Sequence, residues 1–293
     1  MNMTETGVVT HDFIRQNTNT FMKKFDQIAL FLTRHWVVVV SCLLGLFVLT
    51  PFLAPLFMAI GWVFPAKVMY WVYSFVCHQL PERSYFLFGP KISYSLLEIQ
   101  SAWQNTTDAV ILRQFIGNPQ MGWKMAWSDR MFSMFTSIWV FGILWGSLKK
   151  KIGKLPWWGA FLFILPMAID GITHLISDFA GIGQGFRDSN SWLAILTNYT
   201  LPSAFYAGDA WGSFNAWMRL ISGILFGLGS VWFGFPLLQE WLSNSVMVID
   251  DKYEYRKLLG RENERLSSLR LTRIQEQVND ESKKTNRGEK RYE

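Results

Sequence analysis

Long apolar stretches separated by short polar segments form the dominant pattern of this sequence. Between Trp36 and Phe64 the chain contains no Asp, Glu, Lys or Arg, and this stretch exceeds the roughly 20 residues that a transmembrane helix needs. The pattern predicts four membrane-spanning helices, at residues 36–60, 131–148, 156–176 and 217–238. The predicted fold class is therefore all-α, a polytopic membrane protein with about four transmembrane helices.

A fifth apolar segment, near residues 66–80, is too short to count as a further span. It carries Lys67 near its start and His78 near its end, which leaves an apolar length of about half a membrane. We expect a re-entrant or interfacial helix here. A full crossing would be the alternative, and it would invert the side of the membrane assigned to everything that follows.

The basic residues predict the orientation of the chain. The short loop SLKKKIGKLP between the second and third spans contains four lysines, and loops of this kind remain on the cytoplasmic side. Both termini are also rich in Lys and Arg, which places both on the cytoplasmic side. An even number of spans requires the two termini to lie on the same side. We expect a multi-pass protein of the cell inner (plasma) membrane with cytoplasmic termini, in contact with the lipid bilayer, and residues 61–130 and 177–216 on the outer face.

This orientation implies three parts. Residues 1–35 form a cytoplasmic N-terminal segment, 36–241 a transmembrane domain and 242–293 a charged cytoplasmic tail. From residue 250 on, the tail holds 22 of the 50 charged residues of the chain, with a thin apolar stripe of Leu258, Leu259, Leu266, Leu269 and Ile274. It is either a solvated helix or a helix that docks a protein partner through residues 250–278. The net charge of +6 is too mild to indicate nucleic-acid binding.

Polar residues gather at the outer ends of the predicted spans. Asp170, His174 and Asp178 are spaced i, i+4 and i+8 and so share one helix face. Charged groups at the edge of a membrane pair with one another, line water or take part in function. We expect the following residues to converge: Cys77, His78, Glu82, Arg83, Asp129, Arg130, Asp170, His174, Asp178 and Arg219.

The stretch CHQLPERS at residues 77–84 carries a resemblance to a known family. Together with SDRMFSMFTSIWVFGILWG and PMAIDGITHL, it resembles a family of prokaryotic integral membrane proteins known as a domain of unknown function. A Cys-His-Gln-x-Pro-Glu-Arg-Ser motif marks that family, and the resemblance covers roughly residues 36–240. Relatives often carry a cysteine where this chain has Ser128, and sometimes a second where it has Met131. The resemblance implies no established activity.

Three interpretations of the polar cluster remain open. In the first, a helix break at Pro81 is held by ion pairs, with Glu82 or Asp129 neutralising Arg83 and Arg130, and Asp170 meeting Arg219. In the second, a divalent metal is bound by His78, His174, Asp170 and Cys77, whose side chains are ordinary zinc ligands. In the third, the carboxylates and histidines form a proton or solute path.

These interpretations correspond to three functions. The first is a structural or accessory component of a membrane assembly. The alternatives are a membrane metal-binding or redox enzyme that uses Cys77, His78, Asp170 and His174, and a transporter. The absence of GxSxG, HExxH and Gly-rich phosphate-loop motifs gives no support to a hydrolase.

Overall fold

The computed structural model describes residues 27–289, so the predictions for residues 1–26 lie outside the described part of the chain. Two compact units are present. Residues 35–239 form one unit, and the described residues before and after this range, 27–34 and 240–289, form the other. The larger unit contains all the helix ends that concern the site, and the description below begins with it.

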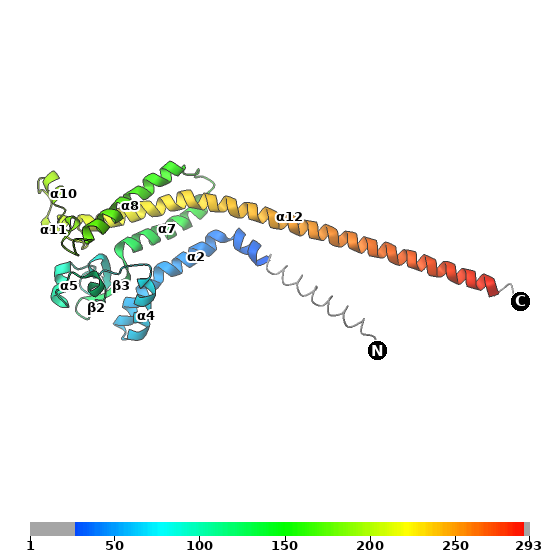
Figure 1. Ribbon diagram of the computed structural model, residues 1–293, viewed down its shortest axis with the longest axis horizontal. Helices are drawn as coiled ribbons and strands as arrows, with labels where there is room; N and C mark the ends of the chain where they lie inside the picture. The colour runs from blue at the N-terminus through cyan, green and yellow to red at the C-terminus, as the bar shows by residue number, and fades with distance from the viewer. Residues whose placement is uncertain (1–26, 290–293) are drawn as a thin grey trace. The chain divides into compact units, whose positions relative to one another are not determined.

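Four helices are long and apolar enough to cross a membrane among the residues that the structure describes. The first, Trp36–Ala59, consists of α2 (Trp36–Leu49), a 3-10 turn at Thr50–Phe52 and α3 (Leu53–Ala59). The others are α7 (Asp129–Leu148), α8 (Trp157–Asp178) and the N-terminal part of α12 (Phe214–Glu289). In Figure 1, α7 and α8 run alongside the beginning of α12. The prediction of an all-α polytopic membrane protein is confirmed.

The fifth apolar segment forms α4 (Val63–Ser74). Its 12 residues extend about 18 Å at 1.5 Å per residue, well short of the roughly 30 Å hydrocarbon core. This helix does not qualify as a span, as predicted. It begins and ends earlier than the predicted 66–80, because the chain turns out of the helix after Ser74 and leaves Cys77 and His78 in irregular backbone.

Small residues bring α7 and α12 into close contact. A Cβ atom on Gly223 would lie 2.1 Å from Ser133 Oγ, and one on Gly227 would lie 2.1 Å from Ser137 Oγ. The two serine hydroxyls donate across the contact, Ser133 to the Arg219 carbonyl and Ser137 to the Gly223 carbonyl, at 3.1 Å each. This small-residue packing fixes the register of α12 on α7 and so places Arg219 beside the start of α7.

The segment between α4 and α7 contains a small antiparallel sheet that the sequence pattern did not predict. Its strands are β1 (Ser84–Leu87), β2 (Gly117–Asn118) and β3 (Gly122–Ser128), in the order β1-β3-β2. Two short helices, α5 (Leu96–Ala102) and α6 (Ala109–Leu112), complete it. Phe86, Ile99, Leu112 and Phe115 belong to its apolar core. The sheet holds Ser84, the end of the CHQLPERS segment, opposite Ser128 at the start of α7.

The segment between α8 and α12 folds into three short helices, α9 (Phe186–Ser189), α10 (Ser191–Leu196) and α11 (Ser203–Tyr206). Asn190 lies between the first two in the left-handed region, with φ of 42°, a conformation that asparagine tolerates well. Its buried amide donates to the carbonyls of Arg187 and Tyr206 at 2.6 and 2.8 Å. These bonds hold the turn that directs Arg187 toward α8.

Candidate functional site

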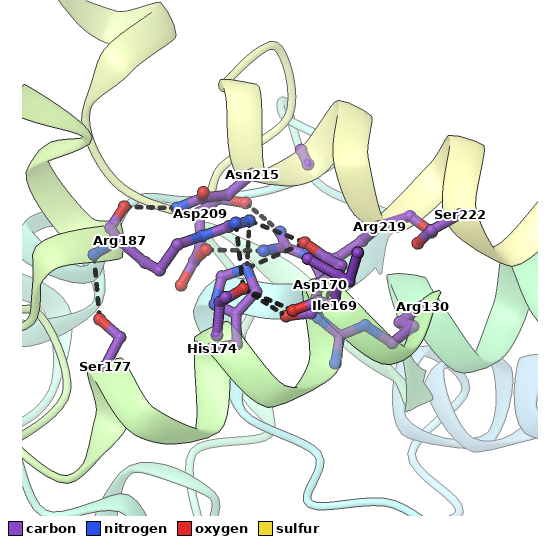
Figure 2. Close-up of polar contacts among 12 residues, drawn as sticks. Arg130, Ile169, Asp170, His174, Ser177, Arg187, Asp209, Asn215, Arg219 and Ser222 are labelled. Atoms are coloured by element: carbon purple, nitrogen blue, oxygen red, sulfur yellow. Dashed lines mark hydrogen bonds and ion pairs between the residues drawn. The ribbon is translucent and has the colours of Figure 1, made fainter. Parts of the chain in front are cut away.

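The site lies where α7 and α12 begin and α8 ends. Figure 2 shows Asp170 and His174 from α8, Arg219 from α12, and Arg187 and Asp209 from the connecting segment with their polar ends turned toward one another. We define the helix-end cluster as Arg83, Asp129, Arg130, Asp170, His174, Asp178, Arg187, Asp209 and Arg219. All of these residues belong to the unit of residues 35–239.

Five members of the cluster form one continuous row of ion pairs, here named the Asp209 row. Arg83 donates to both carboxylate oxygens of Asp178 and, through Nε, to Asp209, at 2.7 Å in each case. Asp209 then accepts from Arg219 Nη1 at 2.6 Å. Arg219 Nε donates to the two oxygens of Asp129 at 2.9 and 2.8 Å. The row therefore connects the end of α8 with the first turns of α12 and α7.

A second row, the Asp170 row, consists of Arg130, Asp170 and Arg187. Asp170 accepts from Arg130 Nη2 through one oxygen and from Arg187 Nη2 through the other, both at 2.7 Å. The same Arg187 nitrogen lies 3.1 Å from His174 Nε2. Because an arginine can only donate, His174 accepts at Nε2 and is the neutral tautomer protonated at Nδ1. This row ties α7 to α8 at a second point.

The two rows balance their charges. The Asp209 row contains three aspartates and two arginines, and the Asp170 row contains one aspartate and two arginines. Together they hold four positive and four negative groups. Buried charges are tolerated when each is paired and hydrogen-bonded, and Arg219 and Asp209 have side chains only 1% and 3% exposed. Burial would raise the pKa of Asp209, but Arg83 and Arg219 hold it well below its usual value.

Seven of the ten residues predicted to converge lie in the helix-end cluster, but their pairings differ from the predicted ones. Arg83 pairs with Asp178 and Asp209 and not with Glu82 or Asp129. Asp170 pairs with Arg130 and Arg187, whereas Arg219 pairs with Asp129 and Asp209. The predicted pairing of Asp170 with Arg219 lacks Arg187 and Asp209. In the structure Arg187 pairs with Asp170, and Asp209 pairs with Arg219.

The CHQLPERS segment attaches the sheet and α4 to this cluster. Cys77 Sγ accepts from the backbone N–H groups of Gln79 and Ser128 at 3.4 and 3.3 Å. Gln79 has a left-handed backbone, with φ of 54°, and its side chain donates to the Tyr70 carbonyl of α4 at 2.8 Å. The predicted break at Pro81 is wrong in position: the helix ends at Ser74, and Pro81 instead opens the 3-10 turn Pro81–Arg83.

A cavity of about 150 Å³ lies between this segment and the start of α7. It is lined by Cys77, His78, Arg83, Ser128, Asp129, Arg130 and Arg219, with Val76, Gln79, Leu80 and Met131. His78 is exposed at this cavity, whereas Cys77 is buried. The structure thus brings the first residues of the motif close to the cluster without making them members of its ion pairs.

Glu82, within the motif, and Lys124 of β3 are both buried and belong to neither ion-pair row. Glu82 is 2% exposed, and neither of its carboxylate oxygens has a hydrogen-bond partner. Burial raises the pKa of Glu82 to about 7, against the opposing effect of Arg83. Lys124 is completely buried, donates to the carbonyls of Gln79 and Arg113, and burial lowers its pKa to about 7.

The four proposed metal ligands do not come together. No three His, Cys, Asp or Glu side chains within the described residues are arranged to hold a metal ion. His174 Nε2 is engaged by Arg187, and Asp170 by two arginines. Cys77 is bonded to the backbone of Gln79 and Ser128. Three of the four proposed ligands, His174, Asp170 and Cys77, are therefore already accepting hydrogen bonds with atoms that would have to bind the metal.

Sequence reasoning missed Arg187, Asp209 and Lys124, along with Asn190 and Asn215, whose amides support the Arg187 carbonyl. A signal for two of them was present. The connecting segment from Asp178 to Phe214 contains only four charged residues, among them Arg187 and Asp209. Isolated charges in so apolar a segment need partners, and that argument would have identified both. Lys124 gave no such signal, because lysine side chains are mostly exposed.

Comparison with known proteins places the chain in a family. A family model described as "Predicted membrane protein (DUF2085)" matches residues 119–233. An uncharacterized protein of the archaeon Methanocaldococcus jannaschii is 30% identical over 172 residues, which cover 56% of this chain and 83% of the relative. The chain belongs to the DUF2085 family. No solved structure matches it.

The DUF2085 match covers β3, α7, α8 and the beginning of α12. Eight of the nine residues of the helix-end cluster fall within it, and only Arg83 precedes it. The CHQLPERS segment also precedes the matched range. The family description gives a membrane protein and no activity.

Proposed function

We propose that this DUF2085 protein is a structural or accessory component of a membrane assembly. The observation that carries the proposal is that the charged groups of the helix-end cluster pair with one another. Every aspartate in it accepts from at least one arginine, and the two rows together are electrically neutral. A cluster whose charges satisfy one another fixes helix ends. None of the four aspartates of the cluster is free for proton transfer or for a cation.

The orientation and the division of the chain belong to the same proposal. Four lysines between α7 and α8, at positions 149–154, favour the cytoplasmic side for that loop. The helix-end cluster would then lie on the outer face of the inner (plasma) membrane, with both termini inside. The three parts 1–35, 36–241 and 242–293 follow from this arrangement. We also propose that the CHQLPERS motif is a feature of the family. It is the segment that brings Arg83 into the cluster.

The second unit supplies the surface for a partner. α12 continues beyond residue 239, and its apolar side chains there are strongly solvent-exposed: Leu258 58%, Leu259 47%, Leu266 47%, Leu269 52% and Ile274 56%. Leu259 and Leu266 are seven residues apart and so lie on nearly the same face of the helix. Burial of one such side chain contributes about 1.5–3 kcal/mol, so a partner helix would gain from covering the stripe. Residues 277 and 278 of the predicted docking range have no described side chains.

The docking role is tested by comparing the proteins that co-purify with four forms of the chain from native membranes. These are the full chain, a truncation after Ser243, Leu259→Gln with Leu266→Gln, and a control with Arg261→Gln and Ser268→Gln. The control positions lie on the opposite face of the helix and receive the same side chain. We expect a defined partner with the full chain and the control and its loss from the other two forms. Identical sets of co-purifying proteins in all four forms would refute the docking role.

The metal alternative has its own measurement. Elemental mass spectrometry of protein purified without chelator is compared with a His78→Ala, His174→Ala variant. The proposed function predicts no metal that depends on these histidines. A near-stoichiometric metal that disappears in the variant would contradict it and would establish a metalloprotein.

A further inference from the structure

An apolar crevice lies between α7 and α12 at the end opposite to the helix-end cluster. Its volume is about 260 Å³, and all of its lining residues are apolar: Phe141, Leu144, Trp145, Leu148, Ile152, Leu228, Val231 and Trp232. Leu144 and Ile152 are 48% and 38% exposed, so the crevice opens to the surface of the helices. In a membrane this surface faces hydrocarbon, which makes an acyl chain the occupant of matching chemistry.

A cluster of lysines lies at one end of this crevice. Leu148 and Ile152 line the crevice, and Lys149, Lys150 and Lys151 lie between them in the sequence. The loop is held in place because Trp232, another lining residue, donates from Nε1 to the Gly153 carbonyl at 2.8 Å. Lys149 lies over the Trp145 ring, with Nζ 5.7 Å from the ring centroid. Lys150 and Lys151 are exposed.

We propose that this crevice and the lysines beside it form a binding site for an anionic phospholipid. One acyl chain occupies the crevice, and the phosphate of the headgroup lies against Lys150 and Lys151. Charge complementarity selects the occupant. Basic residues at the membrane surface attract anionic lipids by about 1 kcal/mol for each Lys, whereas a second copy of this chain would bring the same lysines and be repelled. The site is remote from the helix-end cluster, so it holds or fails independently of the proposed function.

Native mass spectrometry of the purified full chain in detergent tests the site. The probes are phosphatidylglycerol and phosphatidylcholine with identical acyl chains, added at equal concentration. We expect phosphatidylglycerol to bind preferentially and to remain bound after partial removal of the detergent. In Lys150→Gln with Lys151→Gln, the preference for phosphatidylglycerol should fall roughly tenfold or more, because two lysines at about 1 kcal/mol each are lost.

A second variant tests the crevice itself. Leu144→Trp fills it and should weaken binding of both lipids alike, while Ile143→Trp adds the same side chain at a neighbouring exposed position outside the crevice and should change neither. Lys252→Gln with Lys257→Gln removes the same charge from exposed positions of α12 and controls for net charge. Equal binding of the two lipids by the wild-type chain would overturn the proposal. Equal effects of the two lysine double variants, or of the two tryptophan variants, would also overturn it. Detection of a second copy of the chain in place of lipid would have the same consequence.

Discussion

At the scale of single residues, Glu82 differs from the four aspartates of the neighbouring helix-end cluster. The four aspartates of the cluster each accept from arginine, but both oxygens of Glu82 lack a partner. Its pKa is raised to about 7 from the ordinary 4.5 by burial. The folded protein therefore retains a proton that the unfolded chain has already released, and stability falls as the pH rises from about 5 to about 7.

Glu82→Gln should remove this loss. At pH 8 we expect the variant to be more stable than the wild type by about 3 kcal/mol, from a pKa difference of about 2.5 at 1.36 kcal/mol per pH unit. At pH 4 the two proteins should be nearly equal, because Glu82 is then protonated in both states. Denaturant unfolding in detergent at the two pH values measures the difference, with the exposed Glu264→Gln as control. A stability difference that is the same at both pH values would show that Glu82 does not titrate in this way.

At the scale of elements, the contact between α7 and α12 depends on two glycines. A Cβ on Gly227 would lie 2.1 Å from Ser137 Oγ and 2.8 Å from the backbone nitrogen of Ile138. The backbone of α7 would therefore have to move. Because Arg219 reaches Asp129 across the same pair of helices, any such movement would also disturb the Asp209 row.

Gly227→Ala should therefore destabilise the protein, by the roughly 1–3 kcal/mol typical of overpacking. Gly234→Ala provides the matched control, since a Cβ there meets nothing within 4 Å. In a helix interior the exchange of Gly for Ala is favourable by itself, by about 1 kcal/mol. Opposite signs of the change in unfolding free energy are thus expected for the two variants. Equal changes at both positions would indicate that the contact is looser than described.

The spans could be predicted because a membrane requires each spanning helix to have a minimum length and an apolar composition. Both properties can be read from a single sequence. The end of α4 and the three strands were harder to predict. β3 is buried on both faces over most of its length, so its pattern lacks the alternation that identifies a strand. The left-handed Gln79 is likewise a consequence of contacts with Tyr70 and Lys124, which the local sequence does not specify.

The candidate site was predictable in its location and less so in its connections. The i, i+4 and i+8 spacing brought Asp170, His174 and Asp178 to one face, and the predicted topology placed them near Asp129 and Arg219. Which arginine meets which aspartate depends on distances between helices, and these are set by the Gly223 and Gly227 contacts and by the turn at Asn190. Pairing is therefore a property of the packed structure.

At the scale of the whole transmembrane unit, the two rows connect elements that are far apart in the sequence. The Asp209 row joins residues 83, 129, 178, 209 and 219, and the Asp170 row joins 130, 170 and 187. Asp209 is the single residue of its row that contacts both arginines. If the cluster has a structural role, removal of this one carboxylate should weaken the contacts that join α7, α8 and α12.

The most direct measurement is the unfolding free energy of Asp209→Asn in detergent, beside the exposed control Asp251→Asn. The substitution keeps the size of the side chain and leaves Arg83 and Arg219 buried with one carboxylate fewer. We predict a loss of about 3–5 kcal/mol, the usual effect of breaking a buried ion pair, and no change for the control beyond about 0.5 kcal/mol. A stability of Asp209→Asn within about 0.5 kcal/mol of the wild type would contradict the structural role of the cluster.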